Sequence, residues 1–496
     1  MAGMVLDADA AYLAIRSRDA RFDGRLFVGV ASTGVYCRPI CRVRTPRREN
    51  CRFFDTPAQA EAAAFRPCLK CRPEVAPGPG MAWSVMDASR TLARQAADWL
   101  DAHAAGGAEP SVAALARQLG VSDRHLRRIF QAEHGVTPMQ YLQTRRLLTA
   151  KQLLTDTQLP MAQVAFASGF RSLRRFNACF AGSYRMSPTR LRRALPLGAP
   201  ADSATISLKL GLRAPYESER LARFVAQRAI PGVECVDGLR VRRSVRPGTV
   251  ADAAGWLEVA LPADALAQPF VHLTLPVELA ASSARIVAAV RRWLDLDAAP
   301  ETIHAGLADL PGAAGQRLPG GIDAFELMVR AVLGQQVTVA AARTLARRLV
   351  DRFGTPCATP WPDLDRLFPA PEALAAAEPG DIAALGIIGS RAAAIVAMAR
   401  QWPALAPLVR AGEPPAPLIA ALCALPGIGP WTAHYVAMRA LSWPDAFPPN
   451  DIAVMKAMKQ RFGTATAREA EAQSQAWRPW RAYAVLRLWS SLEVTA

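Results

Sequence analysis

Four cysteines near the amino terminus have the spacing of a metal site. Three residues separate Cys37 from Cys41, and after a further 26 residues Cys68 and Cys71 are separated by two. Two close pairs of thiols supply the four ligands of a tetrahedral zinc ion in a domain too small to be stable alone. Surrounding arginines push a thiol toward thiolate, which is both the metal-binding and the nucleophilic form. The site could therefore be structural, reactive or both, and Zn2+ is the expected cofactor.

Arginines and a fifth cysteine accompany this cluster. Cys51 is followed closely by two phenylalanines, which is typical of a strand interior, so we expect it to pack in the core rather than to bind metal. Arg38, Arg42 and Arg44 lie close to the first two thiols. Guanidinium groups at this density can hold the phosphates of a DNA backbone, and we expect these arginines to bind DNA.

A second candidate centre lies near the carboxyl terminus. The segment LPGIGPWTAHYVAMRA places Gly427 and Gly429 directly before a predicted helix, where backbone amides can hold a DNA phosphate without reading bases. Asp451 follows in the segment FPPNDIAVMKAMKQRF. An aspartate there could simply cap a helix, which is a frequent use of this residue. Its coincidence with the glycine turn favours a catalytic carboxylate.

The charge of the whole chain is concentrated in its first part. The 496 residues carry a net charge of +17; residues 1–80 hold 13 Lys and Arg against 8 Asp and Glu, and residues 81–196 hold 16 against 7. Such a basic region is typical of one that binds a polyanion. The start has no signal-peptide pattern, and no apolar window is long enough for a membrane helix. We expect a cytoplasmic protein that binds double-stranded DNA and no membrane.

Two segments of the basic part have a helix-turn-helix pattern. In SVAALARQLGVSDRHLRRIFQAEHG, Gly120 marks the turn, and Arg124 and Arg128 point outward from the second helix. The segment MAQVAFASGFRSLRRFNACFAGSYRMSPTRLRR repeats this pattern, with Arg171 and Arg174 outward. We expect these four arginines to bind DNA. Any amphipathic helix pair could show such spacing, and arginines that only clamp phosphates read no sequence.

A linker, LPLGAPADSATI, leads from the basic part into a region of alternating apolar residues. Ile206, Leu208, Leu210 and Leu212 alternate with other residues, which predicts a strand in a compact antiparallel sheet covered by the helix SERLARFVAQRA. The chain is thus predicted to be a multidomain α+β protein. We expect four domains: a small zinc-bound domain (1–78), an all-α double helix-turn-helix domain (84–196), an α/β sheet domain (204–290) and an all-α domain (291–496).

The cysteine region resembles a known family. The segments TGVYCRPICRVR, RREN and AFRPCLKC are similar to the amino-terminal domain of the Ada family of adaptive-response regulators, over about the first 75 residues without a gap. The resemblance implies that Cys37 accepts a methyl group from a DNA phosphotriester, with Cys41, Cys68 and Cys71 completing the zinc site. Methylation would turn a thiolate that faces phosphates into a neutral thioether, so affinity for DNA should rise. A zinc site that only folds the module is the alternative.

The remaining segments resemble two further families. The helix-turn-helix pair, joined by MQYLQTRRLLTAKQLL, resembles the AraC-type DNA-binding domain. The segments LPGGIDAFELMVRAVLGQQVTVAAA, LPGIGPWTAHYVAMR, PPNDIAVMKAMKQRF and WRPWRAYAVLRLW are similar, in this order, to the AlkA family of inducible 3-methyladenine DNA glycosylases. That similarity runs from about residue 205 to the end. It implies that the sheet domain is TBP-like and that residues 291–496 form a helix-hairpin-helix glycosylase domain.

The AlkA resemblance implies a set of site residues. Asp451 would be the catalytic acid residue, and Trp431, Tyr435 and Trp489 would line the pocket. An electron-rich aromatic face attracts a cationic N-alkylated purine by about 0.5 to 2 kcal/mol. A carboxylate can then steady the oxocarbenium-like sugar and orient water. Each aromatic residue could equally belong to the core.

Three departures refine what these resemblances imply. Bifunctional relatives carry a lysine where this chain has Trp431, which implies a monofunctional glycosylase that leaves an abasic site. In the family a leucine can fill the space of a flipped base, whereas this chain has Gln336, which can fill it by hydrogen bonding. An Ada protein often ends in a methyltransferase domain with a Pro-Cys-His-Arg active site. The chain has no such Cys-His pair, so we expect no direct reversal of O6-methylguanine.

The leading hypothesis joins a transcription activator, which senses methylation through a single-turnover methyl transfer to Cys37, to a DNA-3-methyladenine glycosylase II. Such an activator is expected to contact RNA polymerase, and we expect a monomer. One alternative is a zinc and helix-turn-helix regulator whose glycosylase fold is an inactive DNA clamp. Another is a repair enzyme whose first 196 residues only localise it on DNA.

Overall fold

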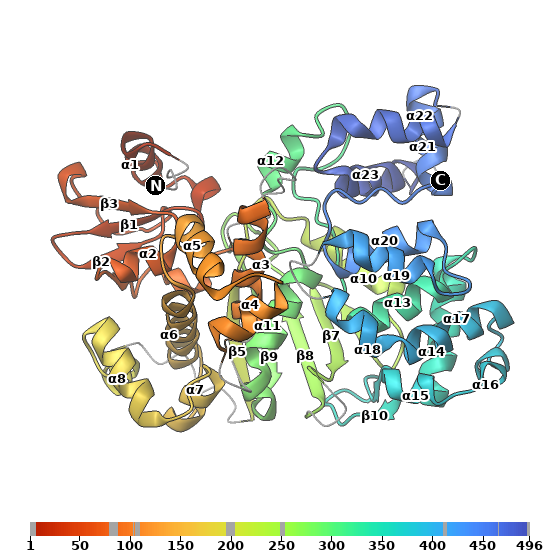
Figure 1. Cartoon of the computed structure of the whole chain (residues 1–496), viewed down its shortest axis with the longest axis horizontal. Helices are drawn as coiled ribbons and strands as arrows, with labels where there is room; N and C mark the ends of the chain where they lie inside the picture. Colours follow the sequence, from red (N-terminus) through yellow and green to blue (C-terminus); the bar gives the residue numbers. More distant parts are fainter. Residues whose placement is uncertain are drawn as a thin grey trace. The chain divides into compact units, whose positions relative to one another are not determined.

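The chain folds into two compact units (Figure 1). The computed structural model describes residues 6–78, 88–102, 104, 110–194, 204–248, 253–409, 414–464 and 466–493. The first unit contains Met1–Ala214 and Pro269–Ala288, and the second contains Pro215–Gln268 and Ala289–Ala496. The boundary expected between residues 78 and 84, and most of the linker expected at residues 195–206, lie outside the described residues.

The first unit begins with a small four-stranded sheet of order β3-β1-β2-β4. Strand β1 pairs antiparallel with β2 and β3, and β2 pairs in parallel with β4. Phe27, Tyr36 and Phe65 pack together in its core. The elements are α1 (Ala8–Arg16), β1 (Phe27–Val30), β2 (Val35–Cys37), the 3-10 helix η2 (Arg48–Asn50), β3 (Cys51–Phe54), α2 (Pro57–Ala62), β4 (Arg66–Pro67) and the 3-10 helix η3 (Pro73–Val75).

Helices α3 to α9 form the double helix-turn-helix part of the first unit. Gly120 and Gly169 have left-handed backbones at the two turns, with φ of +67° and +83°. At Gly169 a side chain would collide with the carbonyl oxygen of Ala104, so only glycine fits. Ser122 and Ser172 are the N-cap residues of α5 and α8, the second helix of each helix-turn-helix part. The helices are α3 (Ala88–Ala102), α4 (Val112–Gln118), α5 (Asp123–His134), α6 (Pro138–Asp156), α7 (Met161–Ala167), α8 (Leu173–Tyr184) and α9 (Pro188–Ala194).

A pair of antiparallel strands completes the first unit. Strand β5 (Thr205–Gly211) pairs with β9 (Phe270–Pro276), and Leu208 lies opposite Leu273. Ile206, Leu208 and Leu210 are buried, as their alternation predicts. Helix α6 contacts β5, because the side-chain amide of Gln152 donates a hydrogen bond to the Lys209 carbonyl over 2.9 Å. The 3-10 helix η4 (Val277–Ser282) and the start of α11 (Ser283–Trp293) follow β9.

The second unit contains the antiparallel strands β6, β7 and β8, in which β7 pairs with both neighbours, and a larger helical part. The helical part has two hydrophobic cores, one around Phe325 and Met328 and one around Trp477. The elements that carry the site are α10 (Ser218–Arg228), β6 (Glu234–Asp237), β7 (Arg240–Val245), β8 (Gly255–Ala260), α13 (Ala324–Leu333), α14 (Val339–Phe353), α19 (Pro415–Cys423), α20 (Pro430–Ala440), α21 (Ile452–Phe462) and α23 (Arg481–Glu493).

Shorter elements fill the rest of the second unit: α12 (Pro300–Ala305), β10 (Thr355–Pro356), β11 (Arg366–Leu367), α15 (Pro371–Ala375), α16 (Pro379–Ala383), α17 (Gly389–Arg400), α18 (Trp402–Leu405), the 3-10 helices η5 (Ala406–Val409) and η6 (Gln475–Trp477), and α22 (Ala467–Ser474). No single helix among the described residues has the length and apolarity to span a membrane. Within the described part of the chain, only α17 together with the segment Trp402–Val409 meets that criterion, across a bend of 63°. The architecture confirms the multidomain α+β prediction.

Candidate functional sites

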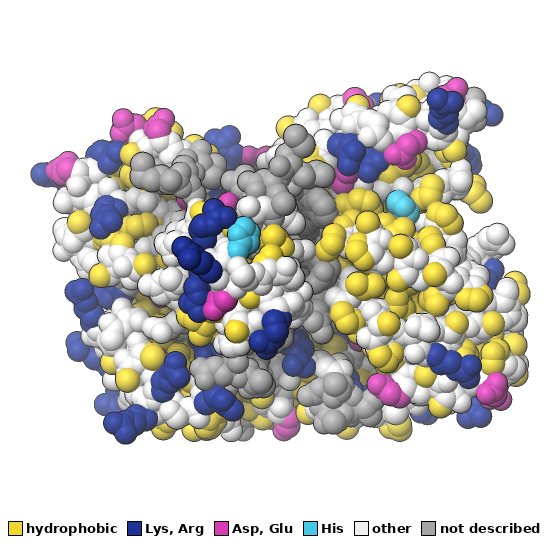
Figure 2. All heavy atoms as spheres, in the orientation of Figure 1, with side chains coloured by type: hydrophobic (Ala, Val, Ile, Leu, Met, Phe, Trp, Pro, Cys, Tyr) yellow, Lys and Arg dark blue, Asp and Glu magenta, His cyan; other side chains and the backbone are white. Residues whose placement is uncertain are grey.

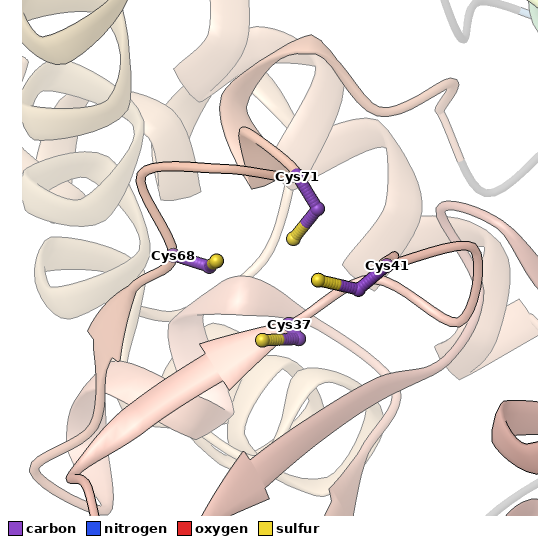
Figure 3. Close-up of side chains that lie close together, drawn as sticks. All are labelled: Cys37, Cys41, Cys68 and Cys71. Carbon is purple, nitrogen blue, oxygen red and sulfur yellow. The ribbon is translucent and has the colours of Figure 1, made fainter. Parts of the chain in front are cut away.

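The four predicted cysteines meet at one point of the amino-terminal sheet (Figure 3). Cys37 ends β2, Cys41 lies in the following loop, Cys68 directly follows β4, and Cys71 lies in the loop before η3. Their sulfur atoms point toward a common centre and all lie within 4.8 Å of one another. A tetrahedral ion with Zn–S bonds of about 2.3 Å requires sulfur atoms about 3.8 Å apart. The cluster therefore fits a four-coordinate metal ion with little adjustment.

The four thiols have unequal surroundings. The backbone amide of Arg38 lies 3.3 Å from Cys71 Sγ and donates to it. Hydrogen bonds within the cluster raise the pKa of Cys37, lower the pKa of Cys68, and lower that of Cys41 to about 7. Backbone amides contribute further hydrogen bonds at Cys41 and Cys68. A sulfur that accepts an N–H bond shares its electron density, so these contacts favour ligand roles for Cys41, Cys68 and Cys71.

Two residues near the cluster belong to the core of the zinc module, by which we mean residues 6–78. Cys51 begins β3, is buried, and donates from its thiol to the Arg47 carbonyl over 3.3 Å, outside the four-sulfur cluster. Arg38 is only 6% exposed and forms an ion pair with Asp23, with 2.8 Å between Arg38 Nε and Asp23 Oδ1. The side chain of Arg38 therefore braces the metal loop, and the expectation that it binds DNA is not supported by its burial.

The other predicted DNA-binding arginines of the first unit are exposed. Arg42 and Arg44 follow the metal loop, Arg124 and Arg128 lie on α5, and Arg171 and Arg174 lie at the turn before α8 and on it. Figure 2 shows Lys and Arg side chains gathered over the position of α5. The apolar side of α5 is buried, so the basic side of this helix is the one presented to solvent.

The second candidate centre is a groove in the second unit with a volume of about 1780 Å³. The glycine turn lies at its edge between α19 and α20. Gly427 has a left-handed backbone with φ of +79°, and Gly429 is the N-cap residue of α20. Neither a side chain nor backbone fills the space beside Gly429, so a phosphate could approach the first turn of α20 there.

Asp451 lies in this groove and is only 6% exposed. It is the N-cap residue of α21, because its Oδ1 accepts a hydrogen bond from the Val454 amide over 2.9 Å. The same oxygen accepts from Trp489 Nε1 over 3.0 Å, and Oδ2 accepts from Trp431 Nε1 over 2.8 Å. The capping role and a place in the groove, which were alternatives in the sequence, are thus combined in one carboxylate.

The predicted aromatic residues lie together around this carboxylate. The rings of Trp431 and Tyr435 stack with 5.4 Å between centroids and 13° between planes, and Tyr435 lies 6.4 Å from Trp489. Rings stacked at this distance leave no room for a base between them. All three residues line the groove. Their exposed faces and edges therefore bound one side of any base that enters beside Asp451.

Arginines surround the phenol of Tyr435 at the base of the groove. Arg439 Nη1 donates to Tyr435 Oη over 2.7 Å. Burial favours the neutral phenol, but the positive charges of Arg439, Arg228 and Arg330 together lower the pKa of Tyr435 below its ordinary value. The Tyr435 oxygen acts as acceptor in the hydrogen bond with Arg439. The hydroxyl proton of Tyr435 can therefore be donated to a ligand.

Phe224 and Arg228 are among the groove residues that could not be predicted from the sequence. Both lie on α10 four residues apart, and the Arg228 guanidinium lies 3.8 Å from the centroid of the Phe224 ring. The apolar period of α10 accounts for its buried residues but not for these two. One signal in the sequence could have indicated a binding surface. An aromatic residue and an arginine lie one helix turn apart, at positions that do not belong to the apolar stripe of α10.

Gln336 lies at the rim of the groove, in the turn after α13, and is exposed with φ of +51°. Its neighbour Gln335 is held in place, donating to the Gly427 carbonyl over 3.1 Å and to Thr432 Oγ1 over 2.9 Å. The amide of Gln335 thus ties the turn that carries Gln336 to the glycine turn before α20.

Family profiles match successive parts of the chain. They are the metal binding domain of Ada at residues 10–74, a helix-turn-helix domain at 115–194, the AlkA N-terminal domain at 207–323, and the HhH-GPD superfamily of base excision DNA repair proteins at 329–482.

Three curated proteins are similar over different lengths. A probable bifunctional transcriptional activator/DNA repair enzyme AlkA of Mycobacterium tuberculosis is 38% identical over 98% of this chain and 97% of its own length. DNA-3-methyladenine glycosylase 2 of Escherichia coli is 34% identical over 56% of this chain and 95% of its own length. The bifunctional transcriptional activator/DNA repair enzyme Ada of Escherichia coli is 33% identical over 30% of this chain and 39% of its own length.

Proposed function

Because the chain belongs to the family of AlkA-type bifunctional transcriptional activator/DNA repair enzymes, we propose that it excises N-alkylated purines such as 3-methyladenine from DNA and senses DNA methylation through Cys37. The observation that carries the first activity is the place of Asp451. Its carboxylate lies in a groove among electron-rich rings and is held by the indole nitrogens of Trp431 and Trp489.

The groove suits a cationic base for electrostatic reasons. An N-alkylated purine carries a positive charge, which the faces of Trp431, Tyr435 and Trp489 attract more strongly than they attract a neutral base. The carboxylate of Asp451 adds a negative charge on the same side. The arginines at the base of the groove, among them Arg439 beside the Tyr435 hydroxyl, oppose a cation.

The reaction is hydrolysis of the N-glycosidic bond. As the bond between C1′ and the purine nitrogen breaks, its electron pair neutralises the cationic base, and positive charge develops on the sugar. Asp451 stabilises that charge, and its hydrogen bonds with the two indoles hold the carboxylate in place as the charge appears. Water adds its oxygen to C1′ and releases a proton. Since Trp431 occupies the position of the lysine of bifunctional relatives, the product is an abasic site.

Two further features of the groove support binding of a flipped base. Gly427 and Gly429 would hold a backbone phosphate at the start of α20. Gln336, exposed on a turn anchored by Gln335, would enter the space that the flipped base leaves in the duplex.

The second activity is methyl transfer to Cys37. The four-sulfur cluster fits Zn2+, which would keep the thiolates unprotonated at neutral pH. Cys37 Sγ would attack the methyl carbon of a phosphotriester, forming an S–C bond while the C–O bond breaks and the phosphate leaves as a diester anion. The loss of one negative charge at Cys37 would strengthen binding to DNA. Arg42 and Arg44, both exposed, would contact the phosphates.

The methylated first unit would act as a transcription activator. Arg124, Arg128, Arg171 and Arg174 are exposed on the two helix-turn-helix parts, where they can contact a promoter. Activation would involve RNA polymerase. We place the protein in the cytoplasm and expect it to act as a monomer.

One experiment tests both activities. The full chain is incubated with methylated DNA, its peptides are analysed by mass spectrometry, and released bases are separated by chromatography from the same tube. One added methyl group on the Cys37 peptide together with free 3-methyladenine supports both activities. Free base without the modified peptide would contradict the sensor, and the modified peptide without free base would leave a regulator with an inactive glycosylase fold.

A further inference from the structure

Charged side chains are buried where the zinc module meets helix α6. Glu74 and Lys151 form an ion pair in which both side chains are almost completely inaccessible, at 0% and 1% exposed. Arg72, directly after Cys71, donates to Glu74 over 2.9 Å and to Asp156 at the end of α6 over 2.6 Å. Two side chains in the last two turns of α6, those of Lys151 and Asp156, thereby contact the loop that carries Cys71.

A second contact joins the other pair of cysteines to the same helix. Tyr36 precedes Cys37 in β2, and its hydroxyl donates to Glu61 Oε1 over 3.2 Å. Thr144, in the first half of α6, donates to Glu61 Oε2 over 2.9 Å. The zinc module therefore contacts α6 in both halves of the helix, through neighbours of Cys37 and of Cys71.

Strand β5 takes part in the same assembly, although it follows the helix-turn-helix part in the sequence. The Lys209 amide donates to Asp156 Oδ2 over 3.4 Å. Arg213, just after β5, is 5% exposed and donates to the Asp23 carbonyl over 3.0 Å. Asp23 in turn holds Arg38, the neighbour of Cys37.

Such a buried ionic cluster does little for stability by itself, because removing charges from water offsets most of their attraction. Its effect is geometric, since each buried charged or polar group fits only one arrangement of partners. Helix α6 is 19 residues long, contacts α5, α7 and α9, and joins the two helix-turn-helix parts. Whatever holds the zinc module on α6 therefore also holds Cys37 at one position relative to the two recognition helices, α5 and α8.

We propose that the cluster of Glu61, Arg72, Glu74, Lys151 and Asp156 makes the zinc module and both helix-turn-helix parts one rigid DNA-reading body, so that methylated Cys37 engages a phosphate at one fixed spacing from the bases read by α5 and α8. The proposal rests on Cys37 as the methyl acceptor. The protein therefore rejects DNA in which the phosphate contact and the base contacts are separated by a different distance, even when both contact sites are present.

The test compares three full-length chains: wild type, Lys151→Met and Arg145→Met. Lys151→Met removes one buried partner but leaves Glu74 paired with Arg72. Arg145→Met is the matched control, because Arg145 lies on the same helix but forms a more exposed pair with Asp101, which belongs to α3 and not to the zinc module. If Lys151→Met does not fold, Thr144→Val, which removes the uncharged contact with Glu61, takes its place.

The main measurement is how the affinity for DNA changes with the spacing between the two contact sites. Duplexes are selected from a random library by the methylated wild type and footprinted, and two to five base pairs are then inserted between the footprints of the zinc module and of the nearer recognition helix. We expect insertion to weaken wild type and Arg145→Met by about tenfold or more, because two rigidly linked contacts lose their joint effect when the geometry forbids both. Lys151→Met should bind the original duplex more weakly and discriminate less against the insertions. Equal tolerance of insertions by all three chains would overturn the proposal.

Two further measurements separate this proposal from the acceptor role of Cys37. Methyl uptake from a short phosphotriester duplex should proceed at the same rate in all three chains, since Lys151 does not touch the cysteines. If even wild type takes up no methyl group, the acceptor role fails. Hydrogen exchange then still decides the rigid body: Lys151→Met should expose amides of residues 72–76 and 148–156 together, and unchanged exchange in both segments would contradict it.

Discussion

Trp489 Nε1 lies 3.0 Å from Asp451 Oδ1, the same oxygen that caps helix α21. Trp431 approaches the other carboxylate oxygen from α20. Three separate elements therefore determine the orientation of one buried carboxylate. An aspartate that served only as a helix cap would need neither indole, and this arrangement is the reason to assign Asp451 a chemical role.

Asp451→Asn should lower the rate of base release by about 100-fold or more, because a neutral amide stabilises positive charge on the sugar poorly. The amide keeps the size of the carboxylate and one acceptor oxygen. Release of 3-methyladenine from methylated DNA, measured by chromatography in single turnover, gives the rate.

Asp309→Asn is the matched control. Asp309 also accepts a hydrogen bond from an indole, that of Trp477 over 2.9 Å, in the same unit of the chain but outside the groove. We expect Asp309→Asn to release base at the wild-type rate. If both variants lose activity equally, the loss reflects packing around the indoles, and the chemical assignment of Asp451 is wrong.

Trp431→Phe should keep most of the stacking on Tyr435 but lose the hydrogen bond with Asp451 Oδ2. A hydrogen bond with a charged group contributes about 1.5 to 3 kcal/mol, so the chemical step should slow by about 10-fold to 100-fold. Binding to a duplex that contains an abasic site should change much less. A variant that loses binding and keeps its chemical rate would show that Trp431 only holds the base.

The sequence predicted the chemical groups better than their contacts. The resemblance to the AlkA family implied that Asp451 and the three aromatic residues share one site, and the structure brings them together. The sequence could not show that the indole nitrogens face Asp451, because their direction depends on the angle between α20 and α23. Phe224 was missed for the same reason: it reaches the groove from α10, some two hundred residues before Asp451, and tertiary packing alone brings the two near.

The burial of Arg38 in the zinc module could likewise not be predicted from the sequence. Its place directly after Cys37 in an arginine-rich segment indicated a phosphate contact, as for Arg42. Arg38, which directly follows β2, instead points inward to Asp23, with which it forms a buried ion pair. A charge pattern in sequence does not reveal which arginine has a buried carboxylate within reach.

Arg38→Met and Arg42→Met should therefore have opposite effects. Removing one partner of a buried ion pair leaves the other charge unpaired and costs about 3 to 5 kcal/mol, so Arg38→Met should destabilise the zinc module. Arg42→Met should leave stability unchanged and reduce the salt dependence of DNA binding by about one unit of slope. Urea unfolding and binding at several salt concentrations measure the two effects. An exchange of these two phenotypes would contradict the inward position of Arg38.

Cys37→Ser should abolish methyl uptake and weaken zinc binding while base release continues at the wild-type rate, because the two activities use different units of the chain. Cys51→Ser is the control, since Cys51 is buried outside the cluster and only donates to a backbone carbonyl. It should retain zinc and methyl uptake. Metal content by mass spectrometry and methylated peptides distinguish the variants. Induction of transcription that survived in Cys37→Ser would contradict the switch.

Glu61 should make the stability of the first unit depend on pH. Burial raises the pKa of Glu61 to about 8, against the opposing effects of the hydroxyls of Thr144, Tyr36 and Tyr184 and of the Lys151 ammonium. In the unfolded chain the same group has its ordinary pKa, close to 4.5. Between these values the folded state holds a proton that the unfolded state has lost, so stability is greatest at low pH and falls as the pH rises toward 8.

This fall should amount to about 5 kcal/mol at most, at 1.36 kcal/mol for each unit of pKa difference. Glu61→Gln imitates the neutral acid and should flatten the dependence between pH 5 and 8. Glu49→Gln, which changes an exposed carboxylate of the same module, should leave it intact. Urea unfolding at pH 5.5, 7 and 8.5, with the first unit followed separately by hydrogen exchange and mass spectrometry, gives the slopes. If Glu61→Gln keeps the slope of wild type, the pH dependence originates in another group, and Glu61 is ionised in the folded chain at neutral pH.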